Sequence, residues 1–311
     1  MKSISVIGGL VIDIILRVNE LPKPGQSIFS QEVINDFGGK GMNASIAASK
    51  LGASVKFCGY VGNDDNGRLL IDVLRKHGID TANIHIGKHN TGIAYIVSSS
   101  DSENFIIGTP IIDVAFNDMN EQVLEAVKSS EIILITAELS HDFIEKTVHL
   151  CCENNKKVII DTGPMQIINP KIFRGAFCIS PNKSELEAIV GYRLDSDKDI
   201  IDASIHLLNF EIQNIVVKLG ERGCILVNNE KSVIVDSYKV NAIDSTAAGD
   251  SFIAGLCCAL CEGNNMIEAV SFANKCGALT VTQLGSSSST PSRKDIQLFT
   301  QSNSKKIYFC K

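Results

Sequence analysis

A run of small residues that ends in a carboxylate is the strongest candidate for chemistry in the chain. Residues 244–252 read DSTAAGDSF and lead into an apolar helical pattern. Ala247, Ala248 and Gly249 leave the first backbone N–H groups of that helix uncovered, which makes the helix terminus an anion site. A carboxylate at the same terminus, Asp250, can accept a proton from a hydroxyl while the N–H groups neutralise transferred phosphoryl charge. Asp250 alone would indicate a helix N-cap, and the small residues before it favour the catalytic interpretation.

A second glycine-rich stretch, FGGKGMN over residues 37–43, opens another expected helix. Its glycines, Gly39 among them, allow the backbone to approach a ligand closely. Lys40 and Asn43 add an ammonium and an amide group that can bind hydroxyl or phosphate groups. The stretch therefore predicts a ligand-binding loop at a helix start.

The same stretch also fits a different class of enzyme. From Gly39 to Ala44 the residues match the dinucleotide fingerprint G-x-G-x-x-A, and Asp64 and Asp65 follow near the distance of the acidic residue that binds ribose. However, the fingerprint belongs after the first strand of a βαβ unit, and this stretch follows an inserted segment. A nicotinamide-dependent oxidoreductase that uses residues 39–44 is the alternative function. No G-x-x-x-x-G-K-[ST] occurs, which excludes a P-loop enzyme.

Other candidates stand at expected strand ends or helix starts. Asp13 follows the first expected strand, and ligands of α/β proteins bind at the carboxyl ends of strands. Asn182 and Glu185 lie in SPNKSE, where they indicate a ligand site and an ordinary helix cap equally well. Residues 218–223, KLGERG, read as a strand end leading through a turn or as a hairpin loop. The sequence has no histidine pair at metal-ligand spacing and no G-x-S-x-G elbow.

Short apolar strands alternate with helical patterns along most of the chain. Nearly continuous Val, Ile and Leu runs, typical of strands buried on both faces, occur at residues 4–7, 55–60, 132–135, 158–161, 176–179, 215–218 and 224–227. Helices are expected at residues 40–51, 66–77, 117–129, 141–154, 183–190 and 251–261. A further strand-like stretch, residues 238–243, precedes the small-residue run. The alternation predicts an α/β fold with a mostly parallel central sheet flanked by helices.

Two segments interrupt the alternation, at about residues 14–37 and 91–107. The first contains Pro and Gly followed by an alternating stretch, and the second reads as a hairpin with its turn at residues 99–102. Because neither is followed by a crossover helix, together they predict a small antiparallel sheet that projects as a lid; two decorated surface loops are the alternative. Residues 1–311 are expected to form one domain with this inserted lid, and the weakly patterned tail, residues 302–311, is expected to be peripheral.

Composition restricts the class of protein further. A net charge of −6 argues against a protein that coats nucleic acid or an anionic membrane, and a hydrophobic share of 44% excludes disorder as the dominant state. No apolar run approaches the ~20 residues of a membrane helix. The apolar N-terminus is interrupted by Gly8, Gly9 and Asp13, so a first strand is expected there rather than a signal peptide. The ten cysteines, adjacent at 151–152 and spaced C-x-x-C at 258–261, are expected to be buried small hydrophobes of a cytoplasmic protein rather than zinc ligands.

Residues 37–47, FGGKGMNASIA, and residues 244–255, DSTAAGDSFIAG, resemble the two signature motifs of the ribokinase-like (PfkB) carbohydrate kinase family. The order of the motifs, their separation of about 200 residues and the PNKSE stretch between them also agree. The resemblance extends from Ile4 to about Phe299, with ribokinases the closest members in pattern. It implies a Rossmann-like core with a β-sheet lid, a homodimer formed through that lid, and transfer of the γ-phosphoryl group of ATP to a sugar hydroxyl with Mg²⁺ and a monovalent cation, K⁺.

The resemblance also implies roles for individual residues. Asp250 is the catalytic base, and the anion hole consists of Ala247, Ala248 and Gly249. The sugar is contacted by Asp13, Gly39, Lys40, Asn43 and Glu138. The phosphates, Mg²⁺ and the nucleotide lie near Asn182, Glu185, Lys218, Gly220, Gly223 and Asn274. The monovalent-cation site draws, partly through carbonyls, on Asp244, Thr246, Thr280, Gly285 and Ser289.

Three departures from the ribokinase pattern bear on the substrate. Val11 stands where ribokinases carry an Asn, GTPIID at residues 108–113 replaces a Gly-Ala-Asn, and Lys275 follows Asn274 where a small residue is usual. Since one lost polar contact can redirect specificity, the acceptor is left open between ribose, another furanose-type sugar and a nucleoside. A non-catalytic sugar sensor would need a lost base, and Asp250 is present.

Overall fold

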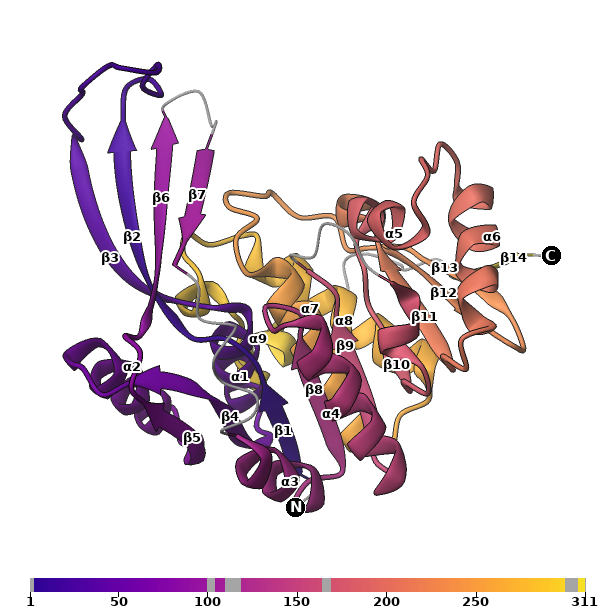
Figure 1. Ribbon diagram of the computed structural model, residues 1–311. Helices are drawn as coiled ribbons and strands as arrows, with labels where there is room; N and C mark the ends of the chain where they lie inside the picture. The colour runs from indigo at the N-terminus through magenta and orange to yellow at the C-terminus, as the bar shows by residue number, and fades with distance from the viewer. Residues whose placement is uncertain (1–2, 100–103, 110–118, 164–168, 300–306, 311) are drawn as a thin grey trace.

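Two β-sheets organise the chain, a large one within the body of the molecule and a small one that projects from it (Figure 1). The computed structural model describes residues 3–99, 104–109, 119–163, 169–299 and 307–310. Most of the GTPIID stretch and most of the predicted turn at 99–102 lie outside the described residues.

The large sheet has ten strands in the order β14-β13-β12-β11-β10-β9-β8-β1-β4-β5. Its parallel strands are β1 (Ser3–Ile7), β4 (Ser54–Gly62), β5 (Asp80–Gly87), β8 (Ile132–Thr136), β9 (Lys157–Asp161), β10 (Cys178–Ile179) and β11 (Asn214–Lys218). The antiparallel strands at one edge are β12 (Cys224–Asn228), β13 (Ser232–Val235) and β14 (Ile307–Cys310). The side chains of the central strands are almost all buried, as in a parallel sheet covered on both faces, and this confirms the predicted fold class.

Helices cover both faces of this sheet (Figure 1). One face carries α1 (Lys40–Lys50), α2 (Asp65–Lys76), α7 (Ala248–Cys261), α8 (Met266–Thr280) and α9 (Arg293–Leu298). The other carries α3 (Asn120–Lys128), α4 (His141–Glu153), α5 (Lys183–Val190) and α6 (Asp197–Leu208). Short 3₁₀ turns are η1 (Pro170–Phe173), η2 (Gly220–Arg222) and η3 (Ser287–Ser289). Every helix in the described part of the chain is too short or too polar to cross a bilayer.

The strands divide the buried side chains into two cores, one on each face of the sheet. Neighbouring strand residues point to opposite faces, so Val6 packs in the core with α7 and α8 while Ile7 packs in the core with α3 and α4. Of the nine cysteines whose side chains the structure describes, eight are buried in these cores and Cys152 is exposed. The expectation that the cysteines act as small hydrophobes is confirmed for these eight.

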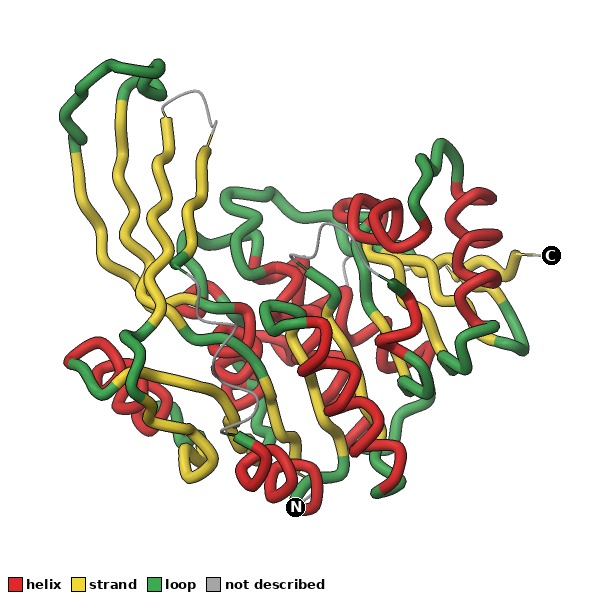
Figure 2. Tube along the Cα trace, viewed as in Figure 1, coloured by secondary structure: helices red, strands yellow, loops and turns green. Residues whose placement is uncertain are grey.

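The small sheet has four strands in the order β3-β2-β6-β7 and stands apart from the helices (Figure 2). Its strands are β2 (Val11–Val18), β3 (Glu32–Gly38), β6 (Gly92–Ser99) and β7 (Asn104–Gly108). They come from the two segments that interrupt the alternation, so these segments form a sheet rather than decorated loops. The hairpins β2–β3 and β6–β7 are antiparallel and meet in a parallel pair, β2 with β6, which the sequence does not indicate.

Residues 238–243 do not form the expected strand. The N–H groups of Ile243 and Asp244 donate to the carbonyl of Val281 after the end of α8, so this backbone is attached to a helix terminus instead of a ladder. The tail was expected to be peripheral, but its residues 307–310 form a strand that pairs with β13 and extends the large sheet.

Candidate active site

Asp250 lies in the first turn of α7 and is only 4% exposed. The helix begins at Ala248, and the residue before it, Ala247, has a left-handed φ of 58° that non-glycine residues rarely adopt. Ala247 has no polar side chain to cap the helix. The N–H of Ala248 donates to the carbonyl of Ser245 over 3.3 Å, so the following N–H groups, those of Gly249 and Asp250, are the ones left for an anion.

Two residues of α1 meet the carboxylate of Asp250. The Nδ2 of Asn43 donates to Oδ2 over 2.9 Å, and the Nζ of Lys40 lies 3.6 Å from Oδ1. The amide oxygen of Asn43, Oδ1, is buried and accepts no hydrogen bond from any described residue. Because a buried polar atom without a partner costs free energy, this oxygen indicates a place for a hydroxyl group of a ligand.

The charges around Asp250 suit a proton acceptor. Burial raises the pKa of Asp250 above its usual value, and the carboxylates of Asp161 and Glu138 add to the rise. The ammonium of Lys40 opposes this rise. Burial alone would lower the pKa of Lys40, but the surrounding carboxylates, including that of Glu185, outweigh burial and raise it. Lys40 is therefore a stable cation beside a carboxylate with an enhanced affinity for a proton, as a general base requires.

The start of α1 reaches this position because it packs tightly on the turn between β1 and β2. Gly39 has a φ of 95°, and a Cβ there would lie 2.6 Å from the carbonyl oxygen of Gly9. A Cβ at Gly41 would lie 2.9 Å from the backbone of Gly8. The glycines therefore permit a close contact between two backbone segments. The strand before this stretch is β3 of the small sheet, which pairs antiparallel with β2, so the stretch does not follow the first parallel strand of a βαβ unit as a dinucleotide loop does.

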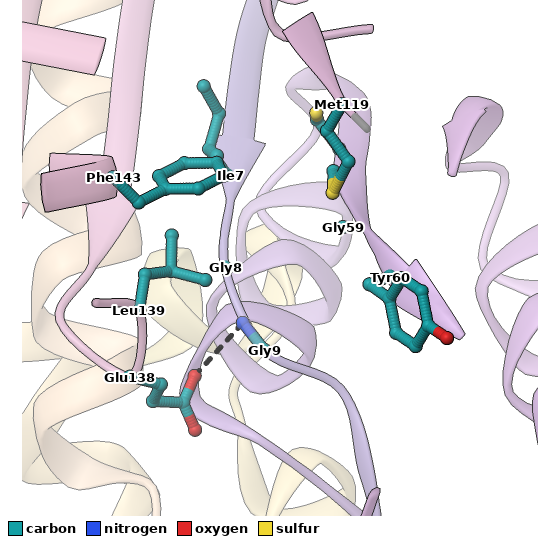
Figure 3. A pocket seen from close by; sticks show the side chains of 10 residues that line it. Ile7, Gly8, Gly9, Gly59, Tyr60, Met119, Glu138, Leu139 and Phe143 are labelled. Atoms are coloured by element: carbon teal, nitrogen blue, oxygen red, sulfur yellow. Dashed lines mark hydrogen bonds between the residues drawn. The ribbon is translucent and has the colours of Figure 1, made fainter. Parts of the chain in front are cut away.

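Glu138 fixes the same turn. It follows β8, and its carboxylate accepts hydrogen bonds of 2.9–3.2 Å from the backbone N–H groups of Gly9, Lys40 and Gly41 and from the hydroxyl of Thr136. The bond to Gly9 is drawn in Figure 3. With four donors, this carboxylate attaches the end of β8 to the start of α1.

The cavity in Figure 3 lies beside Glu138 but is too small for a sugar. It has a volume of about 20 Å³, and its lining includes the apolar side chains of Ile7, Met119 and Phe143. A water molecule needs about 10–15 Å³ of such space, so the cavity has room for roughly one. A ligand that reaches Asn43 and Asp250 must therefore bind elsewhere.

Asp13 lies in β2 of the small sheet instead of at the end of β1. A Cβ on Gly38 would overlap its carboxylate, so the two residues are in close contact. Burial raises the pKa of Asp13 to about 7, and the carboxylates of Asp36 and Glu138 contribute to the rise. Near neutral pH both the carboxylate and the carboxylic acid form of Asp13 are populated. The side chain can therefore accept a hydrogen bond from a sugar hydroxyl or donate one to it.

A fully buried carboxylate at the end of β9, Asp161, belongs to the same cluster, although no sequence motif identified it. Its Oδ1 forms an ion pair with the Nζ of Lys218, and its Oδ2 lies 3.8 Å from the Nζ of Lys40. The Nζ of Lys218 lies 3.7 Å from the place that a Cβ on Gly249 would take, at the first turn of α7. The position of Asp161 at the carboxyl end of a buried parallel strand is the signal that could have identified it.

Asn182 and Glu185 form a capping box at the start of α5. The Asn182 N–H donates to Oε2 of Glu185 over 2.9 Å, and the Glu185 N–H donates to Oδ1 of Asn182 over 2.8 Å. The helix-cap interpretation is thus correct, but Oε2 of Glu185 also accepts a bond of 2.9 Å from the hydroxyl of Thr162. Gly163 leaves space for both Glu185 and Lys40, so this carboxylate borders the cluster around Asp250.

The remaining nucleotide candidates lie at the end of β11, in the turn between β11 and β12, and on α8. Residues 218–223 join two antiparallel strands, which makes the hairpin interpretation correct. Gly220 has a φ of 60° and open space beside it. By contrast, a Cβ on Gly223 would overlap the carbonyl of Val235, and the Nδ2 of Asn274 donates to that carbonyl over 3.0 Å. Gly223 and Asn274 therefore hold β12, β13 and α8 together.

Three of the five monovalent-cation candidates are in direct contact. Thr246 donates to Oδ1 of Asp244 from its N–H over 2.9 Å and from its hydroxyl over 2.7 Å, and the N–H of Gly285 donates to Oδ2 over 3.1 Å. Burial alone would raise the pKa of Asp244, but these hydrogen bonds outweigh it and hold the pKa below its usual value. The hydroxyls of Thr280 and Ser289 instead donate to backbone carbonyls of their own segments.

A lysine outside both motifs binds the loop next to this cluster. The Nζ of Lys50, the last residue of α1, donates to the carbonyls of Ser287, Ser288 and Thr290 at 3.0, 3.1 and 2.8 Å. Helix α1 therefore carries Lys40 beside Asp250 at its start and a lysine that holds the 286–290 loop at its end.

Comparison with known proteins identifies the family. The sequence profile described as pfkB family carbohydrate kinase matches residues 1–293. A ribokinase of Haemophilus influenzae is 30% identical over 296 residues, which cover 94% of this chain and 97% of the relative. The crystal structure of a Thermotoga maritima ribokinase has a TM-score of 0.87 at 32% identity, covering 96% of this chain and 99% of that one. An Arabidopsis thaliana ribokinase, solved in complex with ribose and ATP, has a TM-score of 0.89 at 26% identity, covering 96% and 98%.

The chain therefore belongs to the pfkB family of carbohydrate kinases. This confirms the resemblance based on the motifs at residues 37–47 and 244–255, and the solved relatives share the mostly parallel sheet with its small companion sheet. The enzyme is accordingly a carbohydrate kinase, a phosphotransferase with an alcohol group as acceptor.

Proposed function

We propose that this enzyme transfers the γ-phosphoryl group of ATP to a hydroxymethyl group of a furanose-type sugar, with ribose as the first candidate. The observation that carries the proposal is the buried pair of Asp250 and Asn43, in which the Oδ1 of Asn43 lacks a partner among the described residues. A sugar hydroxyl bound there would have a hydrogen-bond acceptor and a proton acceptor side by side. The ribokinases among the similar proteins, one solved with ribose and ATP, support this choice.

In the proposed reaction Asp250 takes the proton of the attacking hydroxyl. The N–H of Gly249 at the start of α7 would then face the negative charge of the transferred group, joined by that of Ala248 once it turns from the carbonyl of Ser245. Phosphoryl transfer depends mainly on positioning and charge neutralisation, so a base and an anion hole at one helix terminus are a sufficient pair. Asp13 and Lys40 hold the sugar beside them.

The nucleotide is assigned to the other side of the cluster. Glu185 offers carboxylate oxygens of the kind that Mg²⁺ prefers, and Asn182, Lys218 and Gly220 border the same region. When bound, Mg²⁺ supplies neutralisation of the phosphate charges. Gly223 and Asn274 support this region through their contacts with Val235.

A K⁺ ion is proposed to bind near Asp244. The oxygen atoms present there suit a cation. The pKa of Asp244 lies below its usual value, so its carboxylate is ionised, and it is in contact with Thr246 and Gly285. Carbonyls near Thr280 and Ser289 would complete the oxygen ligands. The hydroxyls of both residues donate to backbone carbonyls, which leaves the lone pairs of their oxygens for a cation.

The small sheet is proposed to close over the sugar as a lid and to pair with a second copy of the chain. Asp13, which is proposed to contact the sugar, belongs to β2 of this sheet. Closure would exclude water, which otherwise competes with the sugar as acceptor of the phosphoryl group. The edge strand β7 exposes Phe105, Ile106 and Ile107 by 60, 63 and 64%, an apolar edge of the kind that a dimer covers.

The alternatives are a nucleoside kinase of the same family and a nicotinamide-dependent oxidoreductase. Val11 in place of the usual Asn keeps the nucleoside open, because it removes a polar partner for the sugar. The oxidoreductase is disfavoured, because residues 39–44 pack against backbone and follow β3.

An ATP-consumption screen across pentoses, hexoses, sugar phosphates and nucleosides tests the proposal. A furanose-type sugar should give the highest kcat/KM, and Asp250→Asn should reduce kcat at least ~10³-fold with an unchanged unfolding midpoint. Near-normal turnover by Asp250→Asn would contradict the assigned base. Tight NAD binding without protection by ATP and Mg²⁺ would instead support the oxidoreductase.

A further inference from the structure

We infer that Asp161 is a positioning residue whose buried carboxylate holds the ammonium groups of Lys40 and Lys218 beside the path of the transferred phosphoryl group. The inference rests on the proposed phosphoryl transfer and adds to it a residue that lies outside both family motifs. Asp161 itself is 0% exposed, so it acts through the lysines and not on the substrate.

The three side chains come from separate elements and meet at one carboxylate. Lys40 opens α1, Lys218 ends β11 and Asp161 ends β9. Oδ1 of Asp161 pairs with Lys218, and Oδ2 lies 3.8 Å from Lys40. Lys40 is in turn 3.6 Å from Oδ1 of Asp250. The result is a row of alternating charges, Lys218–Asp161–Lys40–Asp250, that runs from the nucleotide side to the base.

Each end of this row reaches one of the reacting groups. The Nζ of Lys218 is 3.7 Å from the Cβ position of Gly249, so a phosphoryl group bound by the N–H groups of α7 would lie near this ammonium. At the other end Lys40 shares the carboxylate of Asp250 with Asn43, where the attacking hydroxyl is proposed to bind. One short buried side chain thus sets the places of two cations that face donor and acceptor.

The two residues after Asp161, Thr162 and Gly163, also contact the charged side chains of this cluster. The hydroxyl of Thr162 donates to Oε2 of Glu185 over 2.9 Å. A Cβ on Gly163 would lie 3.2 Å from Cε of Lys40 and would overlap the Glu185 carboxylate. The segment 161–163 therefore contacts Lys40 at the start of α1, Glu185 in the capping box and Lys218 at the end of β11. Its glycine leaves space for Lys40 to approach.

Lysines need such a partner here for two reasons. A free lysine side chain has about 2 kcal/mol of rotamer entropy, so an unrestrained ammonium is rarely found in one place. Burial also favours the neutral amine, and Asp161 is one of the carboxylates that raise the pKa of Lys40 against this effect. An amide at position 161 would keep the volume but lose both effects.

The test is Asp161→Asn, measured with the sugar that the screen selects. We expect kcat to fall at least about tenfold, while KM for the sugar and for ATP and the Kd of ADP, measured by calorimetry, change less than about threefold. In the Lys218→Met background, and in the Lys40→Met background, the same change should have a smaller effect on kcat, since the interactions are shared. Asp142→Asn, which removes a carboxylate from an exposed pair with Lys146, is the matched control and should retain wild-type kcat.

Two results overturn the inference while the proposed function stands. One is a wild-type kcat in Asp161→Asn with only a lower unfolding temperature, which would make the cluster a structural ion pair. The other is an equal loss of kcat in all three backgrounds. If Asp161→Asn does not fold, Lys218→Met decides: a fall in kcat that exceeds the rise in KM for ATP supports the inference, and an unchanged kcat rejects it. A wild-type enzyme that phosphorylates no sugar at all rejects the proposed function itself.

Discussion

The hydroxyl of Ser286 donates to Oδ2 of Asp36 over 3.0 Å, and this bond joins the loop next to the proposed cation site to strand β3 of the small sheet. Asp36 is one of the carboxylates that raise the pKa of Asp13. On its other side the loop is bound by Lys50, at the end of the helix that begins with Lys40. The 286–290 loop is therefore linked to the proposed sugar site through both β3 and α1, so a change in the loop is expected to affect that site.

Replacement of Lys50 by Met should make the enzyme more dependent on K⁺. The variant loses three charge-assisted hydrogen bonds to the carbonyls of Ser287, Ser288 and Thr290, so we expect the free energy of unfolding to fall by about 1–2 kcal/mol. With the loop less ordered, the K⁺ concentration for half-maximal rate should rise. Lys76→Met on the exposed side of α2 is the control. Equal K⁺ titrations for wild type and Lys50→Met would show that the loop does not control the cation site.

Gly38→Ala should impair sugar binding without unfolding the protein. A Cβ at this position would overlap the carboxylate of Asp13, which must then move away from its present place. We expect KM for the sugar to rise at least about tenfold, with a smaller change in KM for ATP. Steady-state kinetics with each substrate varied separately measure the difference.

The matched control is Gly108→Ala in β7 of the same sheet, where a Cβ would meet no described atom within 4 Å. Its kinetics should equal those of the wild type. If Gly38→Ala and Gly108→Ala behave alike, Asp13 does not contact the sugar.

The sequence predicted the elements that repeat a local pattern and missed relations between distant positions. The buried strands and both motifs were recognisable, because apolar runs and glycine spacing are local properties. Asp161 was missed because it stands alone at a strand end, and its importance depends on Lys40 and Lys218, which only the fold brings to it. Lys50 was missed for the same reason, since its partners lie 237–240 positions away. Gly39 and Gly41 were found, but only the structure shows that they face backbone.

Asp13→Asn should stabilise the unliganded protein at high pH. The pKa of Asp13 is about 7 in the folded chain and near 3.8 in an unfolded one, so the folded state holds the proton more tightly. The stability that this group contributes is complete below about pH 4 and is lost as the pH rises through about 7. The amide has no such loss, so the variant should exceed wild type in urea unfolding at pH 8 and match it near pH 4.

The same variant should bind sugar more weakly, because the amide has one neutral acceptor oxygen in place of the two oxygens of a carboxylate. Asp72→Asn on exposed α2 serves as the control for removal of a surface charge. A wild-type unfolding curve for Asp13→Asn at pH 8 would show that the carboxylate is not held in an unfavourable ionised state.

Ile106→Asp should separate the proposed dimer. Strand β7 lies at the edge of the small sheet and exposes the neighbouring side chains of Phe105, Ile106 and Ile107 on both of its faces. A carboxylate within an apolar interface would lose its hydration without gaining a partner, so size-exclusion chromatography with light scattering should give the mass of one chain for the variant and of two for wild type. Tyr192→Asp, at an exposed aromatic side chain after α5, should leave the mass unchanged. A dimeric Ile106→Asp would place the contact between copies away from this edge, and a sugar KM that rises as the dimer separates would indicate that the partner's lid stabilises the closed site.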